Sequence, residues 1–130
     1  MKQIYAILAC AALFALAIPA LAQMGAPPIP MSPAEFAQSN AGANVQIAVR
    51  VKRVDRSTLY TELLAHETDT LAKATGISVT IYFPDGTPVI MGSASDVTAG
   101  ALLYVYGVLT KPGHVDAKRV VVDTKYVTVH

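Results

Sequence analysis

The chain has no tryptophan and only one cysteine, and just 15% of its 130 residues are charged. The single Cys10 excludes a disulfide framework within the chain and a cysteine-based zinc site. A formal net charge of +1 excludes a strongly basic nucleic-acid binder and an acidic tail protein. Catalytic signatures such as G-x-S-x-G, H-E-x-x-H and the P-loop are also missing. We therefore expect one domain that is not an enzyme and that uses no cofactor.

The first 22 residues differ in composition from the rest of the chain. Nineteen of them are hydrophobic, and their only charged residue is Lys2. A short positive start, an apolar stretch over residues 4–18, the helix breaker Pro19 and small residues after it are typical of a secretory signal peptide. This pattern predicts cleavage before Gln23. We expect an exported protein, in the periplasm, with secretion into the medium as the alternative.

Two other interpretations of this segment stay open. Residues 4–22 are just long enough to span a membrane as an uncleaved anchor, but a proline followed by Ala-x-Ala favours cleavage. Residues 7–10 (ILAC) look like a lipidation motif, although six apolar residues before the cysteine are too few for an apolar signal region. With cleavage we expect no stable membrane insertion.

Residues 23–43 are predicted to join the signal peptide to the folded domain. Residues 23–30 (QMGAPPIP) are rich in proline and small residues, which favours an extended linker. Residues 32–35 (SPAE) then follow the capping-box pattern of a hydroxyl N-cap, a proline at the first helical position and a glutamate three residues on. We expect a short helix over residues 33–38, from which Phe36 is available to dock on the domain.

Alternation with a period of two begins at Asn44 and marks the start of the folded domain, residues 44–130. Apolar and polar side chains alternate over residues 45–52 and again over residues 59–65, as in half-buried strands. Residues 55–58 (DRST) supply a turn between them. We therefore predict two long strands joined as a hairpin.

The next segment, residues 66–75, is ambiguous. Its threonine and aspartate residues favour a loop, whereas residues 71–74 followed by Gly76 are compatible with one helical turn. Alternation resumes over residues 77–83, which predicts a third strand.

Turns and breakers separate the third strand from the fourth. Residues 84–86 (PDG) predict a turn, and Pro88 limits the residues around it to an edge position. Residues 92–100 are polar and flanked by glycine, with one helical turn expected around residues 95–97.

Two further strands are expected near the C-terminus. Residues 101–109 are almost continuously apolar, and Gly107 within them predicts a bulge that lets a small sheet curl. Residues 111–113 (KPG) turn the chain, residues 117–123 form the next strand, and residues 126–129 extend it or add a short one. Five strands make a small all-β Greek-key barrel the economical fold, since a β-sandwich needs more strands.

Three segments carry a family resemblance: residues 95–100 (SDVTAG), 103–107 (LYVYG) and 117–121 (AKRVV). Their pattern resembles the second half of secreted bacterial OB-fold proteins, over about residues 44–123. The resemblance implies a five-stranded OB-like barrel and says little about activity, because the functions of many such proteins are not established. Periplasmic haem chaperones are also small OB barrels, but their histidine, acidic and tyrosine motif is missing from residues 125–130 (KYVTVH), so haem binding is not carried over.

The histidines do not predict a metal site. His114 and Asp116 form one candidate pair, and residues 66–69 (HETD) form another polar cluster. Zinc needs at least three protein ligands, so solvated loop histidines are the better interpretation. His130 is expected to be a frayed end.

Basic residues gather near the loops that flank the ligand face of an OB barrel, the first–second and the fourth–fifth. The candidate ligand-binding residues are Lys52, Arg56, Lys111, His114 and Lys118, with Arg53 and Arg119 close by. Stacking surfaces are offered by Tyr60, Tyr104 and Tyr106. The alternative is that these cations only mark solvated strand edges.

This pattern predicts an exported, non-enzymatic binding or interaction module. Its partner would be an unknown small anionic or sugar-like ligand, or an envelope protein. The runner-up is a structural or assembly accessory protein of the cell envelope that contacts partners through strand edges. We do not expect nucleic-acid binding, because a mature chain with zero net charge releases few counterions.

Overall fold

The structure, a computed structural model, describes residues 29–68, 70–122 and 128–130. The predicted signal peptide, most of the predicted linker, Asp69 and residues 123–127 lie outside the described residues. Within the described ranges, no helix is both long enough and apolar enough to cross a membrane.

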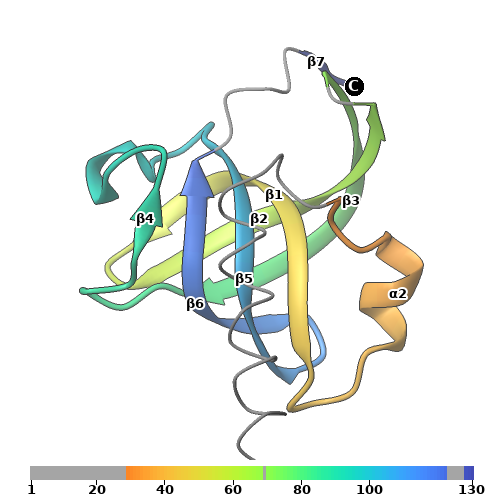
Figure 1. Cartoon of the computed structure of the whole chain (residues 1–130), viewed down its shortest axis with the longest axis horizontal. Coiled ribbons are helices and arrows are strands. Elements are labelled where there is room, and N and C mark those ends of the chain that lie inside the picture. The colour runs from red at the N-terminus through yellow and green to blue at the C-terminus, as the bar shows by residue number, and fades with distance from the viewer. Residues whose placement is uncertain (1–28, 69, 123–127) are drawn as a thin grey trace, which may run out of the picture.

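The described chain is mostly β-strand with one short α-helix (Figure 1), which confirms the predicted all-β class. In chain order the elements are α2 (Pro33–Gln38), β1 (Asn44–Asp55), β2 (Thr58–Thr68), β3 (Leu71–Tyr82), β4 (Val89–Ile90), the 3-10 helix η1 (Ala94–Asp96), β5 (Leu102–Lys111), β6 (His114–Val122) and β7 (Thr128–Val129). The five long strands are those that alternation and apolar runs predict.

The five long strands form a sheet that closes on itself as a ring. β1 pairs antiparallel with β2 and with β5, β2 pairs antiparallel with β3, and β5 pairs antiparallel with β6. A parallel pairing of β3 with β6 closes the ring. Two short strands are added in parallel, β4 beside β6 and β7 beside β3.

Alternating side chains of these strands fill the inside of the ring. Ile47, Val49 and Leu59 are fully buried there with Ile81 and Val105. The polar residues between them face outward, because successive side chains of a strand point to opposite faces. The half-buried pattern predicted for residues 45–52 is thus confirmed.

Helix α2 packs against this core through one side chain, as its sequence predicts. The Ser32 hydroxyl accepts a hydrogen bond from the Glu35 backbone N–H at 3.1 Å, and the Glu35 carboxylate accepts one from the Ser32 N–H at 3.4 Å. This capping box begins the helix. Phe36 is only 5% exposed and belongs to the core.

Gly107 lies at a bulge between β5 and β6, as predicted. The register passes from Tyr106 opposite Arg119 to Gly107 opposite Ala117, so Lys118 is the extra residue. A Cβ atom on Gly107 would collide with the backbone carbonyl of Asp116. Only glycine lets the two strands approach this closely, and the bulge increases the local bend of the sheet.

Two predicted boundaries are wrong. The segment that the sequence leaves open between a loop and a helical turn is neither: residues 66–68 end β2 and residues 71–75 begin β3, where Leu71 pairs with Thr68. Sheet pairing outweighs the weak local preference for a turn of helix. β6 starts at His114 rather than Ala117, because the β5–β6 turn is tight and Lys111 pairs directly with His114. The helical turn expected around residues 95–97 is the 3-10 helix η1.

A smaller apolar cluster lies on the outer side of the sheet. It consists of Ala48, Leu64, Ala72 and Tyr104, with Val129 of β7 packed against it. His130 continues this contact: its N–H donates to the Ala72 carbonyl at 3.0 Å, and its side chain bonds to Glu67. The expectation that His130 frays is therefore wrong, because the pairing of β7 with β3 holds it.

Candidate functional site

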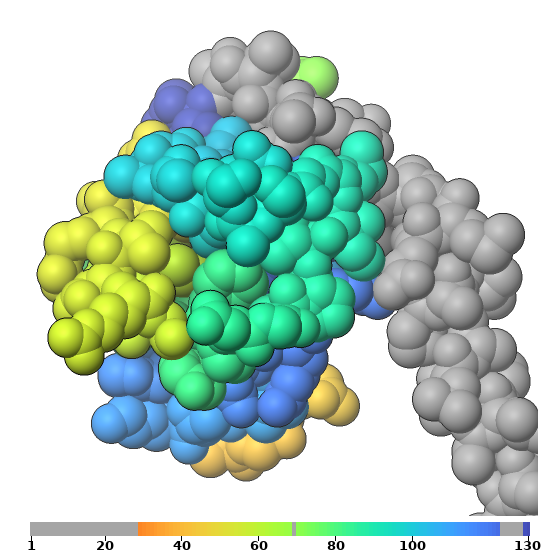
Figure 2. Space-filling model, turned by 90° about the vertical axis from the view of Figure 1, so that its left-hand side faces the viewer, coloured from red at the N-terminus to blue at the C-terminus, as the bar shows by residue number. Residues whose placement is uncertain are grey.

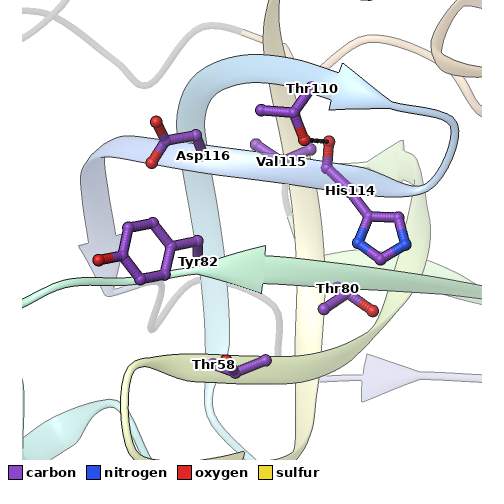
Figure 3. Close-up of a pocket in the computed structure, with 7 residues that line it drawn as sticks. All are labelled: Thr58, Thr80, Tyr82, Thr110, His114, Val115 and Asp116. Carbon is purple, nitrogen blue, oxygen red and sulfur yellow. Dashed lines mark hydrogen bonds between the residues drawn. The ribbon is translucent and has the colours of Figure 1, made fainter.

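An open hollow of about 320 Å³ lies on the ring at the end of β3 (Figure 3). We call it the outer hollow. It is lined by Thr58, Thr80, Tyr82, Thr110, His114, Val115 and Asp116. These residues come from the start of β2, the end of β3 and the β5–β6 hairpin.

Strand register explains why these side chains meet. Thr80 lies opposite His114, and Tyr82 lies opposite Asp116, in the parallel β3–β6 pair. Ile81, between Thr80 and Tyr82, points into the core, so its two neighbours share the outer face. Thr58 of β2 lies opposite Tyr82 and completes the row. Two consecutive strands, β2 and β3, and the later strand β6 thus supply one continuous surface.

The β5–β6 turn is fixed against β3 by hydrogen bonds. The Thr80 N–H donates to the Gly113 carbonyl at 2.8 Å, and the Thr110 hydroxyl donates to the His114 carbonyl at 3.2 Å. In Figure 3 the imidazole of His114 extends toward Thr80, and the ring of Tyr82 lies on the same side as Asp116. Tyr82 is 53% exposed, so one tyrosine ring is open to a ligand.

The outer hollow contains one carboxylate and no lysine or arginine among its lining residues. Asp116 Oδ2 lies 3.2 Å from Lys118 Nζ. Such an exposed pair contributes about 0–1 kcal/mol, so it orients the carboxylate more than it stabilises the fold.

The structure disperses the five candidate residues predicted from sequence. Only His114 lines the outer hollow. Arg56 and Lys111 are next to the hollow in the chain: Arg56 lies in the β1–β2 turn two residues before the lining residue Thr58, and Lys111 directly follows the lining residue Thr110. Lys118 reaches the hollow through Asp116, while Lys52 lies over β2 and contacts Glu62 instead.

Glu62 engages two of the basic residues of β1. Its side chain is 9% exposed, and it lies 3.0 Å from Arg50 Nη2 and 3.4 Å from Lys52 Nζ. The Gly76 N–H also donates to it, at 2.8 Å. The hydrogen bond from Arg50, helped by Gly76 and Lys52, holds the pKa of Glu62 below its usual value despite burial. Sequence reasoning missed this pairing, which follows only once Arg50 is placed opposite Glu62.

The tyrosines predicted as stacking surfaces have different environments. The guanidinium of Arg53 lies 4.1 Å from the ring centre of Tyr60, and that of Arg119 lies 4.1 Å from the ring centre of Tyr106. Burial raises the pKa of Tyr106. Tyr104 is 5% exposed in the outer cluster and offers no stacking surface.

Tyr82, the one exposed tyrosine among the residues that the structure describes, is not among the predicted candidates. Its position in the alternation of residues 77–83 already placed it on the outer face of the third strand. The missing information was the proximity of this strand end to the β5–β6 turn.

No group of three potential metal-binding side chains occurs in the part of the chain that the structure describes. A second open hollow, of about 580 Å³, lies near η1 and is lined by Met91, Asp96, residues 98–102 and Val122.

Comparisons with protein families and with curated proteins find no match for the chain. Function must therefore be inferred from the fold and from the chemistry of its surface.

Proposed function

We propose that the protein is an exported, non-enzymatic module that binds a sugar-like ligand in the outer hollow. The observation that carries this proposal is the exposed ring of Tyr82, set among hydroxyl, imidazole and carboxylate groups between two tight turns. Export rests on the signal-peptide pattern of residues 1–22.

The strand arrangement supports an OB-like Greek-key barrel as the fold. Around the ring the order is β1-β2-β3-β6-β5, and the pair that closes it, β3 with β6, is parallel. OB folds bind ligands on their second and third strands, between the first–second and fourth–fifth loops. The outer hollow occupies the equivalent position. In Figure 2 the yellow-green β1–β2 hairpin, the green end of β3 and the blue β5–β6 segment lie on one face.

The lining chemistry favours a neutral, hydroxyl-rich ligand over a small anion. The ring of Tyr82 offers a flat apolar surface. Thr58, Thr80 and Thr110 carry hydroxyls that donate and accept hydrogen bonds, and Asp116 accepts them. A carboxylate or phosphate placed inside the hollow would meet the charge of Asp116.

The runner-up function, an accessory protein that contacts partners by pairing at strand edges, is less well supported. On β3 the Gly76 N–H donates to Glu62, and the Ile77 N–H donates to the Thr75 hydroxyl at 3.1 Å. These donors are then not available to a neighbouring strand. β4 has only two residues and follows Pro88, which has no N–H to donate.

The proposal is tested by an NMR titration of the ¹⁵N-labelled exported protein with maltotriose, cellotriose and N-acetylchitotriose. We expect at least one to shift the amide signals of Thr80, Tyr82 and His114. Tyr82→Ala should weaken its binding about tenfold, which corresponds to about 1.4 kcal/mol of lost stacking.

The matched control is Ile77→Ala, which removes an exposed apolar side chain of the same strand outside the hollow. It should leave the affinity unchanged. Amide shifts confined to other surfaces, or equal affinities of wild type and Tyr82→Ala, would contradict the proposal. Native mass spectrometry of the protein from the exported fraction gives an independent check, since a retained ligand appears as a discrete added mass.

A further inference from the structure

Two arginines beside the outer hollow have no ion-pair partner among the residues that the structure describes. Within the described residues, the ion pairs join Glu62 to Arg50 and Lys52, Asp116 to Lys118, and Glu67 to His130. Arg53 and Arg56, both exposed near the tip of the β1–β2 hairpin, belong to none of them. The basic residues of β1 and of the turn after it therefore divide into Arg50 and Lys52, which share Glu62, and Arg53 and Arg56, whose charges face solvent.

Arg53 is held in position by an aromatic ring. Its guanidinium stacks on Tyr60, directly opposite it in the β1–β2 pairing, and Tyr60 lies opposite Thr80 of the outer hollow. Since neighbouring strands are about 4.8 Å apart, the backbone of Arg53 lies about 10 Å from that of Thr80. A ligand longer than one sugar ring can therefore lie in the hollow and reach this guanidinium across Tyr60.

Arg56 occupies a backbone conformation that favours glycine. Its φ is 55°, in the left-handed region, within a turn held by a hydrogen bond from the Phe83 N–H to the Ser57 carbonyl at 2.6 Å. Non-glycine residues in this region are strained, and such strain clusters at functional positions. The arginine here places a second guanidinium at the hairpin tip, two residues before Thr58 of the hollow.

We propose that the ligand is an acidic oligosaccharide, with a neutral ring in the outer hollow and a carboxylate bound by Arg53 and Arg56. This inference rests on the proposed function and names its substrate class. The guanidinium of Arg53 is oriented by its stacking on Tyr60, and a planar guanidinium can donate two parallel hydrogen bonds to a carboxylate. The division of charge fits such a ligand. The hollow contains the carboxylate of Asp116, which disfavours an anion there, while the hairpin tip carries Arg53 and Arg56 against the single carboxylate of Asp55 and so keeps a net positive charge.

The experiment compares 3′-sialyllactose, whose one carboxylate is on its terminal ring and whose other two rings are neutral, with its neutral methyl ester, by calorimetry on the exported protein at 20 mM and 300 mM NaCl. We expect the acid to bind at least fivefold more tightly than the ester at low salt. This preference should shrink at 300 mM NaCl, where exposed charges are screened. Arg53→Gln and Arg56→Gln should each reduce the preference, and together abolish it, without changing the affinity for the ester.

The charge-matched control is Lys73→Gln, on an exposed part of β3 away from the hairpin tip. It should leave the preference intact. Equal affinity for acid and ester, or a preference that survives the double variant, overturns this inference and leaves the proposed function standing. If neither trisaccharide binds and the neutral probes also fail, the proposed function itself is overturned.

Discussion

Replacing Glu62 by glutamine tests whether one nearly buried carboxylate joins β1 and β2 to the backbone of β3 at Gly76. Glu62→Gln keeps the shape of the side chain but removes its charge from Arg50 at 3.0 Å and Lys52 at 3.4 Å. Hydrogen bonds to charged groups contribute about 1.5–3 kcal/mol. The glutamine oxygen can still accept from Gly76, and Lys52 is well exposed, so its pair adds little.

We therefore expect Glu62→Gln to lower the free energy of unfolding by about 1–2 kcal/mol at pH 7. For a domain of this size each kcal/mol lowers Tm by roughly 4–8 °C. Urea unfolding followed by circular dichroism measures the change. Asp85→Asn, in the exposed turn after β3, is the control for loss of one negative charge and should unfold like wild type.

The same substitution predicts a pH dependence. The pKa of Glu62 is lowered in the folded state, so its contribution to stability is present above the ordinary glutamate pKa of 4.5, which applies to the unfolded chain. It is lost as the pH falls through the lower folded pKa. The stability gap between wild type and Glu62→Gln should close over that acidic range. A gap that is absent at pH 7, or that persists undiminished at pH 3, refutes this account of the carboxylate.

Two further changes test the packing. Phe36→Ala should destabilise the domain by about 2–4 kcal/mol. This is at or slightly below the usual cost of such a truncation, because α2 is short and can shift. If urea unfolding gives the variant the same stability as wild type, the packing of the helix does not stabilise the domain. Gly107→Ala should cost about 1–3 kcal/mol, because its Cβ meets the Asp116 carbonyl. A thermal midpoint equal to that of wild type would contradict the close approach of β5 and β6.

Local sequence patterns predicted much of the fold. Alternation located β1, most of β2 and the later half of β3, because a strand with one buried face must repeat every second residue. Ser32 and Glu35 predicted the start of α2 because a capping box needs only residues within one turn. Gly107 predicted a bulge because a glycine within an apolar strand lets another backbone approach.

The predicted candidate residues show where local patterns stop being informative. Lys52 and Arg56 are close in the chain, yet Lys52 contacts Glu62, whereas Arg56 lies at a turn and has no ion-pair partner in the described part of the chain. Their difference depends on the register between β1 and β2. Likewise, the start of β3 resembled a helical turn because its partner, the end of β2, is identified only by pairing.

The sequence alone determined the all-β class, the capped helix and the strand that must bend, since each depends on contacts between near neighbours in the chain. Tertiary structure decided which residues line the outer hollow, where we propose that a ligand binds. The outer hollow joins Thr58, Tyr82 and His114, which come from three strands, and the parallel β3–β6 pairing that unites them leaves no local pattern. It results from the closure of the whole sheet, because that closure buries the core side chains of every strand at once.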